Sequence, residues 1–266
     1  MKKPLLSFSV SQEELLVLMT QLGLVYPFGV DPHSYQALAE DELALAGEVA
    51  AHALLARGYL IPASENNLRV EAALADVLTA CAQPHKTLVI EAQHEGRPLE
   101  TYHFHTLPNT FVLHTVAISA IHSFMVFESL AELQEMALRC MDLGTYTAAQ
   151  YPPLLLADAV LTHARQVAQK EGAAAACAIL GEGGLEPLVA GELARLLAGL
   201  KLNISVYCLQ NRQDQTAQLD GFVLLGAENQ LWRLTAKGDK SQPIKEVEAL
   251  PVSPQTVLAS MRSFLG

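Results

Sequence analysis

The sequence predicts an α+β fold in which one unit occurs twice, related by pseudo-twofold symmetry. Stretches with apolar residues at helical spacing alternate with runs typical of strands joined by short turns. The order helices, β-meander, helix appears in residues 1–150 and again in residues 151–266. Of the 266 residues, 51% are hydrophobic and only 17% are charged, which favours a compact folded chain. We expect two such halves, as separate domains or as one continuous domain.

The first half opens with helix signals. Ser11 and Glu14 have the spacing of a capping box, in which both side chains bind free amide groups at a helix start. Apolar residues follow at i, i+3, i+4 and i+7 through Leu22, and Gly23 supplies a stop. The first 80 residues are therefore expected to be a helical bundle. Its further elements are a turn-rich loop over 26–35 and helices over 36–57 and 69–81.

Strand signals dominate the end of each half. Short turns between these strands indicate antiparallel neighbours. In the first half, strands are expected over 87–93, 99–107, 110–116 and 121–127, before a helix from Ser129 to Met141. In the second half, helices over 154–170 and up to Leu200 precede strands over 204–210, 218–225, 230–235 and 243–248 and a last helix from Ser253.

The charge is acidic and unevenly distributed. Residues 1–150 hold 7 Lys and Arg against 17 Asp and Glu, a net −10, and residues 151–266 hold 10 against 11, a net −1. The total of −11 disfavours nucleic acid, because phosphate binding needs clustered Lys and Arg. An acidic first half is suited to a basic protein partner.

The same sequence favours a cytoplasmic protein that binds no membrane. Residues 1–10 lack the apolar segment of a signal peptide, and no apolar run reaches the length of a membrane span. The four cysteines are scattered, with neither CxxC spacing nor a short disulfide framework. We expect buried free thiols in a reducing compartment.

Histidines provide the strongest candidate for chemistry. His103 and His105 are two residues apart in an expected strand, so they share a face, and His114 and His122 lie on neighbouring strands. This resembles the first metal motif of the cupins and suggests a metal-dependent enzyme as the alternative function. The glutamate of that motif is absent, and a turn at Asn109 is expected to place His114 on the other face. The competing interpretation is a set of histidines on a solvated or interface face.

No other pattern indicates catalysis or a cofactor. The sequence has no GxSxG, HExxH or GxxxxGK[ST] motif. Trp232 and Tyr207 are expected in strands, either in the core or at an interface. A non-enzymatic protein-binding function, without a cofactor, is therefore the main prediction, and a scaffold that forms a homodimer is a further alternative.

Three segments of the chain are typical of one known family. They are SVSQEELLVLMTQLGL, ALLARGYLIPASENNLRVEAALADVLTACAQPHKTLVIEAQ, and FVLLGAENQLWRLTAKG before a short helix. Together they resemble the EspG family, the chaperones of type VII (ESX) secretion. The resemblance spans nearly the whole chain. It implies a central antiparallel sheet flanked by two helical subdomains, and recognition of helical secreted substrates of the PE/PPE class.

The expected partner-binding positions lie in the two meanders. Gly96 and Asn109 are in turns of the first meander, and Gly221 and Trp232 are in strands of the second. We expect these regions to hold an apolar helical segment of the partner.

Overall fold

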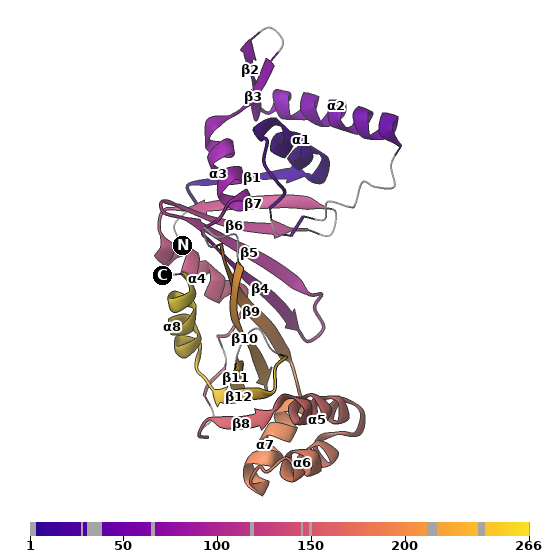
Figure 1. Ribbon diagram of the computed structural model, residues 1–266, viewed down its shortest axis with the longest axis vertical. Coiled ribbons are helices and arrows are strands. Elements are labelled where there is room, and N and C mark those ends of the chain that lie inside the picture. Colours follow the sequence, from indigo (N-terminus) through magenta and orange to yellow (C-terminus); the bar gives the residue numbers. More distant parts are fainter. Residues whose placement is uncertain are drawn as a thin grey trace.

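The computed structural model describes residues 4–27, 29–30, 39–64, 67–117, 120–144, 146–148, 151–211, 217–238 and 243–265. The fold is α+β, as predicted, with one ten-stranded antiparallel sheet, a separate two-stranded hairpin, and helices on both faces of the large sheet (Figure 1). Among the described helices, none is long and apolar enough to span a membrane.

Each half contributes five strands to the large sheet. The elements of the first half are β1 (Leu6–Ser11), α1 (Gln12–Leu22), α2 (Glu40–Ala56), β2 (Leu60–Ser64), β3 (Asn67–Val70), α3 (Ala72–Ala82), β4 (Lys86–His94), β5 (Glu100–Leu107), β6 (Thr110–Val116), β7 (Ile121–Phe127) and α4 (Leu130–Cys140). Those of the second half are β8 (Leu154–Ala157), α5 (Asp158–Glu171), α6 (Ala173–Glu182), α7 (Pro187–Ala198), β9 (Leu202–Asn211), β10 (Ala217–Ala227), β11 (Gln230–Lys237), β12 (Glu246–Pro251) and α8 (Pro254–Leu265).

The strand order is the same in both halves when it is followed from the middle of the sheet. It runs β4-β5-β6-β7-β1 in one direction and β9-β10-β11-β12-β8 in the other, and β4 pairs with β9 at the centre. A helix precedes each central strand, α3 before β4 and α7 before β9, and α4 and α8 end the two halves. This arrangement is compatible with the predicted duplicated unit, whose origin by duplication stays a prediction.

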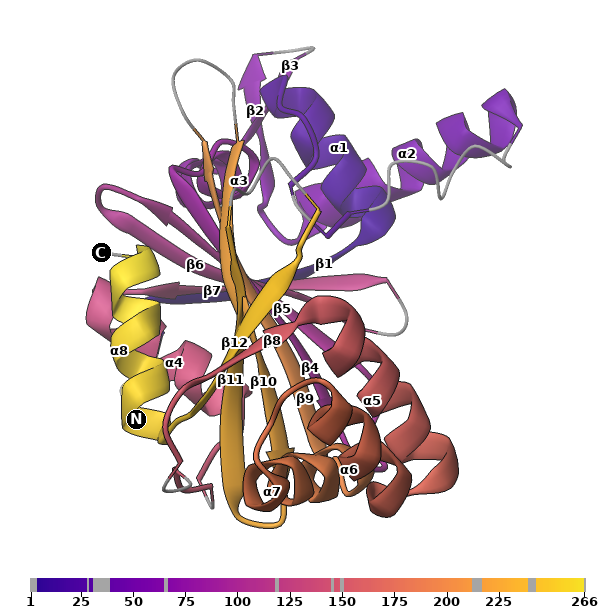
Figure 2. The same ribbon diagram turned by 60° about the horizontal axis from the view of Figure 1, so that its bottom comes forward.

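The two faces of the sheet are covered differently. Residues that pair directly across strands share a face, so the registers divide the core between the faces. Leu88, Phe104 and Leu224 belong to the core under α4 and α8, and this face is called the helix-pair face. On the opposite face, called the subdomain face, Phe124 packs in the core with α1 and α3, and Trp232 in the core with α5–α7. Figure 2 shows α4 and α8 on one side of the sheet and α5–α7 on the other.

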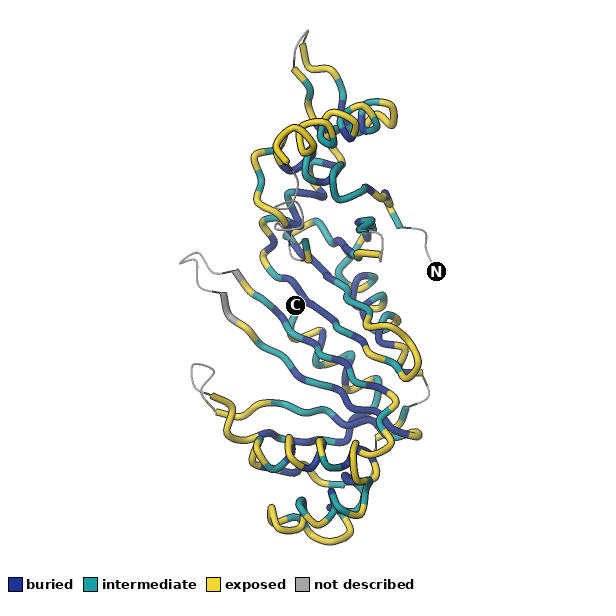
Figure 3. Tube along the Cα trace, turned by 90° about the vertical axis from the view of Figure 1, so that its right-hand side faces the viewer, coloured by how far each residue is buried: buried dark blue, intermediate teal, exposed yellow. Residues whose placement is uncertain are grey.

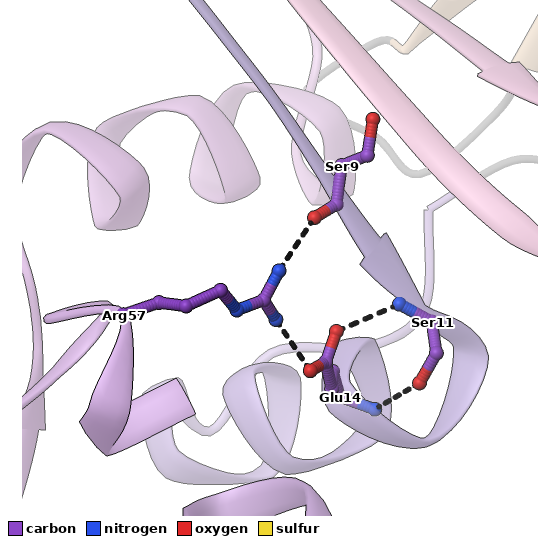
Figure 4. A network of polar contacts seen from close by, with 4 residues as sticks. All are labelled: Ser9, Ser11, Glu14 and Arg57. Carbon is purple, nitrogen blue, oxygen red and sulfur yellow. Dashed lines mark hydrogen bonds and ion pairs between the residues drawn. The ribbon is translucent and has the colours of Figure 1, made fainter. Parts of the chain in front are cut away.

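A polar network joins α1, α2 and β1 (Figure 4). The backbone N–H of Ser11 donates to Glu14 Oε2 at 2.8 Å, and the Glu14 N–H donates to Ser11 Oγ at 3.2 Å, which confirms the predicted capping box. Arg57, just after α2, forms an ion pair with Glu14 and donates to the Ser9 carbonyl at 3.0 Å. The start of α1 is therefore held against the end of α2.

Several sequence expectations for the first half need correction. The first 80 residues are not only helical, because β1 lies at one edge of the large sheet and β2 and β3 form a hairpin. Residues 69 and 70 belong to β3, so the helix expected over 69–81 begins at Ala72. The loop expected over 26–35 and the beginning of the helix expected over 36–57 fall largely outside the described residues.

The second half has one similar error. The helix expected over 154–170 begins only at Asp158, because residues 154–157 form β8 and pair with β12. Leu154 and Leu156 are buried and alternate with exposed neighbours, a period of two that a short window also fits to a helix. The last strand lies at Glu246–Pro251, a few residues later than expected.

Candidate partner-binding face

The middle of the subdomain face lies between the two helical subdomains and is only partly covered. Figure 3 views the molecule from this side, with helices at both ends and strands crossing between them. In β9, Val206 and Cys208 are buried on the helix-pair face, whereas Ser205, Tyr207 and Leu209 are half-buried on the subdomain face. Strand β9 is therefore amphipathic, with one side buried and the other only half covered.

Apolar side chains and one polar pair make up this strip. Leu219 on β10 is 54% exposed and pairs with the half-buried Leu209. Nearby, the Tyr207 hydroxyl donates to Glu91 Oε1 at 3.3 Å. Burial, and then the Glu91 charge, raise the pKa of Tyr207, so its hydroxyl stays a neutral donor. The strip can bury an apolar surface while offering a few hydrogen bonds.

Gly221 lies at the centre of this strip for a structural reason. It pairs with Tyr207, and a Cβ placed on it would lie 2.6 Å from the Val206 carbonyl oxygen. Only glycine allows β9 and β10 this close approach without a shift. Gly221 is itself half-buried, so its backbone is partly accessible beside Tyr207.

The other three expected partner-binding positions do not lie in the strip that contains Gly221. Trp232 is fully buried in the core under α5–α7, where its ring stacks on Tyr151 with the centroids 6.1 Å apart. Gly96 and Asn109 are exposed, but they lie in the turns at opposite ends of β5, whose eight residues span about 27 Å. The sequence analysis did not identify the exposed Leu219 or the half-buried Glu91, although the alternation of apolar and polar residues over 203–208 indicates the same open face.

The four strand histidines form a buried row near the N-terminal subdomain. His103 and His114 pair directly across β5 and β6, so the expectation that His114 lies on the other face is wrong. The two-residue turn at Pro108 and Asn109 pairs Leu107 with Thr110, and the same register pairs His103 with His114. Both rings therefore lie on one face of the sheet. The ring centroids of His103 and His114 are 5.5 Å apart, and those of His114 and His122 are 5.3 Å apart.

The four histidine side chains are buried, which corrects the expectation of a solvated or interface face. The four rings are at most 5% exposed. His105 Nδ1 lies 3.0 Å from Thr87 Oγ1, and His114 Nε2 lies 3.0 Å from His122 Nδ1. Burial lowers the pKa of His103 to about 4 and that of His105 to about 3, and it lowers the pKa of His122. At neutral pH these three rings are uncharged.

The row does not have the geometry of a metal centre. The planes of His103 and His105 differ by 6° and those of His103 and His114 by 30°, so their in-plane lone pairs do not converge on one point. Within the described ranges, no three His, Cys, Asp or Glu side chains are placed to hold an ion. The geometry gives no support to the metal-dependent alternative centred on His103 and His105.

The architecture places the chain in a known fold class. A sheet with one helical subdomain at each end of one face and a helix pair on the other is the fold of a type VII secretion system chaperone. One solved structure that this chain matches is that of the Mycobacterium tuberculosis chaperone EspG5 in complex with a PE25-PPE41 dimer. The TM-score is 0.67 at 12% sequence identity, and the match covers 98% of this chain and 96% of that chain. The predicted resemblance to the EspG family is therefore confirmed at the level of the fold.

Sequence comparisons alone do not reach this result. No protein-family model matches the chain, and no curated protein matches it. The similarity to the solved chaperone is therefore clear in the fold, at a sequence identity of only 12%.

Proposed function

We propose that this protein is a non-enzymatic chaperone or adaptor that holds a helical segment of a secreted substrate. The substrate would belong to a type VII secretion-like system and resemble the PE/PPE class. The segment would lie along the central strip of the subdomain face and contact the adjacent subdomain of α5–α7. The protein would act in the cytoplasm, in keeping with its four free cysteines.

The observation that carries this proposal is the incomplete cover of β9 and β10. Helices α4 and α8 cover these strands on one face, while Leu209 and Leu219 on the other face remain accessible. Burying such apolar area contributes roughly 25 cal/mol per Å² before the cost of ordering the partner. The fold likeness to a chaperone solved with a PE25-PPE41 dimer adds the class of partner.

The test is a titration of the purified protein with a PE–PPE-type dimer from the same organism, followed by calorimetry. We expect a complex of defined stoichiometry, and Leu219→Asp should weaken it at least about tenfold, as loss of an apolar contact at an interface centre does. The matched control is Leu155→Asp, because Leu155 is 58% exposed on the helix-pair face of edge strand β8.

Two results would contradict the proposal. Equal effects of the Leu219 and Leu155 substitutions would remove the strip as the binding site. Light scattering that shows a homodimer broken by Leu219→Asp, with no binding of the dimer, would favour the scaffold alternative instead.

A further inference from the structure

Helix α2 presents an apolar stripe that its own subdomain covers only in part. Only Ala50 and Leu54 among its 17 residues are buried. Leu45 and Val49, one turn apart, are 62% and 60% exposed. The first turns of α2 extend beyond α1 (Figure 1), so α1 covers this end of the helix only in part.

The stripe forms one wall of a groove between α1 and α2. The groove has a volume of about 530 Å³. Its α2 wall follows the spacing i, i+3, i+4, i+7, which is the face that a packed neighbouring helix contacts. This wall includes Glu42, Leu45, Ala46 and Val49. The 17 residues of α2 give it a length of about 25 Å, which suits a helical occupant.

The groove is also strongly acidic. Helices α1 and α2 contain neither lysine nor arginine, while their acidic residues are Glu13, Glu14, Glu40, Asp41, Glu42 and Glu48. Glu13, Glu14 and Glu42 line the groove itself. Glu14 pairs with Arg57, and Glu42 accepts a hydrogen bond from the Ala39 N–H at 3.0 Å. The Arg57 guanidinium offsets the charge of Glu14, whereas a backbone N–H leaves the charge of Glu42 in place.

We infer that this groove is a second docking site, and that its occupant is an amphipathic helix of a partner protein with Lys or Arg beside its apolar stripe. The apolar wall would bury the stripe, and Glu13 and Glu42 would meet the basic side chains. A second copy of this chain is a poorer occupant, because its α2 would bring four further acidic residues against the same rim. The Arg57 network in Figure 4 fixes α1 against the end of α2, so one end of the groove is formed in advance.

The probe is a stapled helical peptide with leucines at i, i+3, i+4 and i+7 and lysines on both flanks. Its control carries glutamate at every lysine position. We expect anisotropy titrations to show binding of the basic peptide only, weakening as salt increases. Leu45→Asp with Val49→Asp should weaken binding by about tenfold or more, as removal of anchoring apolar contacts does.

A charge-matched pair of variants locates the electrostatic contribution. Glu13→Gln with Glu42→Gln removes two charges from the groove, and Gln at position 42 retains the acceptor that caps α2. Glu40→Gln with Glu48→Gln removes two charges from α2, at positions outside the groove lining. We expect only the first pair to reduce both affinity and salt dependence.

Three outcomes would overturn the inference: no binding of the basic peptide, equal binding of both peptides, or equal effects of the two glutamine pairs. Self-association abolished by Leu45→Asp would assign the groove to a second copy and would also overturn it. None of these results bears on the Leu219 strip, so failure here is distinct from failure of the proposed function.

Discussion

The role of His103 and His105 depends on whether other parts of the chain bury them. In the sequence, two histidines in one strand suggest a ligand pair, and their shared face is correctly predicted from the period of two. Their burial depends on the helices and loops that lie over the strands, which strand periodicity does not specify. His114 is different, because counting residues through the turn at Pro108 and Asn109 is enough to place it opposite His103.

The buried histidines should make the fold acid-sensitive. In the folded protein the pKa values of His103 and His105 lie near 4 and 3, below the ordinary value of 6.5. Below about pH 6.5 these histidines take up protons in the unfolded chain but stay neutral in the folded protein until the pH approaches 4. The free energy of unfolding is therefore highest above about pH 6.5 and decreases as the pH falls. At pH 5 each ring should cost about 2 kcal/mol of unfolding free energy.

Urea denaturation at pH 7 and pH 5 measures this loss. His105→Gln should reduce the difference between the two pH values by about 2 kcal/mol. Thr87→Val, which removes the hydroxyl 3.0 Å from His105 Nδ1, changes stability at both pH values but leaves the histidines to titrate. A wild-type protein with the same stability at both pH values would contradict the assignment of neutral buried rings.

At the scale of elements, the sequence predicts those helices and strands that depend on neighbouring residues. It predicts poorly those strands that depend on pairing with a distant strand. The cap of α1, the strands β4–β7 and the cap of α4 at Ser129 follow from residues close together in sequence. By contrast, β1 and β8 are edge strands of six and four residues, and their state depends on distant partners β7 and β12. The open strip could not be derived from the sequence for the same reason, because it depends on which face each helical subdomain covers.

The start of α1 offers a test of how helices are fixed in the N-terminal subdomain. Glu14→Ala removes a capping contact and the ion pair with the partly exposed Arg57, and should cost about 2 kcal/mol of unfolding free energy. Glu14→Gln keeps a capping acceptor and loses only the charge, so its cost should stay below about 1 kcal/mol.

Hydrogen exchange distinguishes a local effect from a global one. In the Glu14→Ala protein, amides of α1 should exchange faster, while amides of β9 should change only with global stability. Ser129→Ala, which removes the side-chain cap of α4, is a comparison for the loss of one cap without an ion pair. Equal stabilities of the Ala and Gln variants at position 14 would rule out a contribution from capping.

At the scale of the molecule, β4 and β9 join the two halves into one sheet. The core beneath α4 and α8 draws Leu88, Ile90 and Phe104 from the first half and Ile204 and Leu224 from the second. The halves are thus similar in organisation yet share one core. Sequence reasoning left open whether they are two domains or one, because pairing across such a distance leaves no local pattern.

This shared core predicts that residues 1–150 and 151–266 do not fold separately. Separation would expose the five core side chains named above, and each contributes about 1.5–3 kcal/mol when buried. Their sum is comparable to the 5–15 kcal/mol that stabilises a typical domain. We expect each half expressed alone to show no cooperative unfolding, and the two halves expressed together to associate and recover it. A monomeric half with a cooperative transition of its own would instead establish independent domains, and the β4–β9 pairing would then be a docking contact between them.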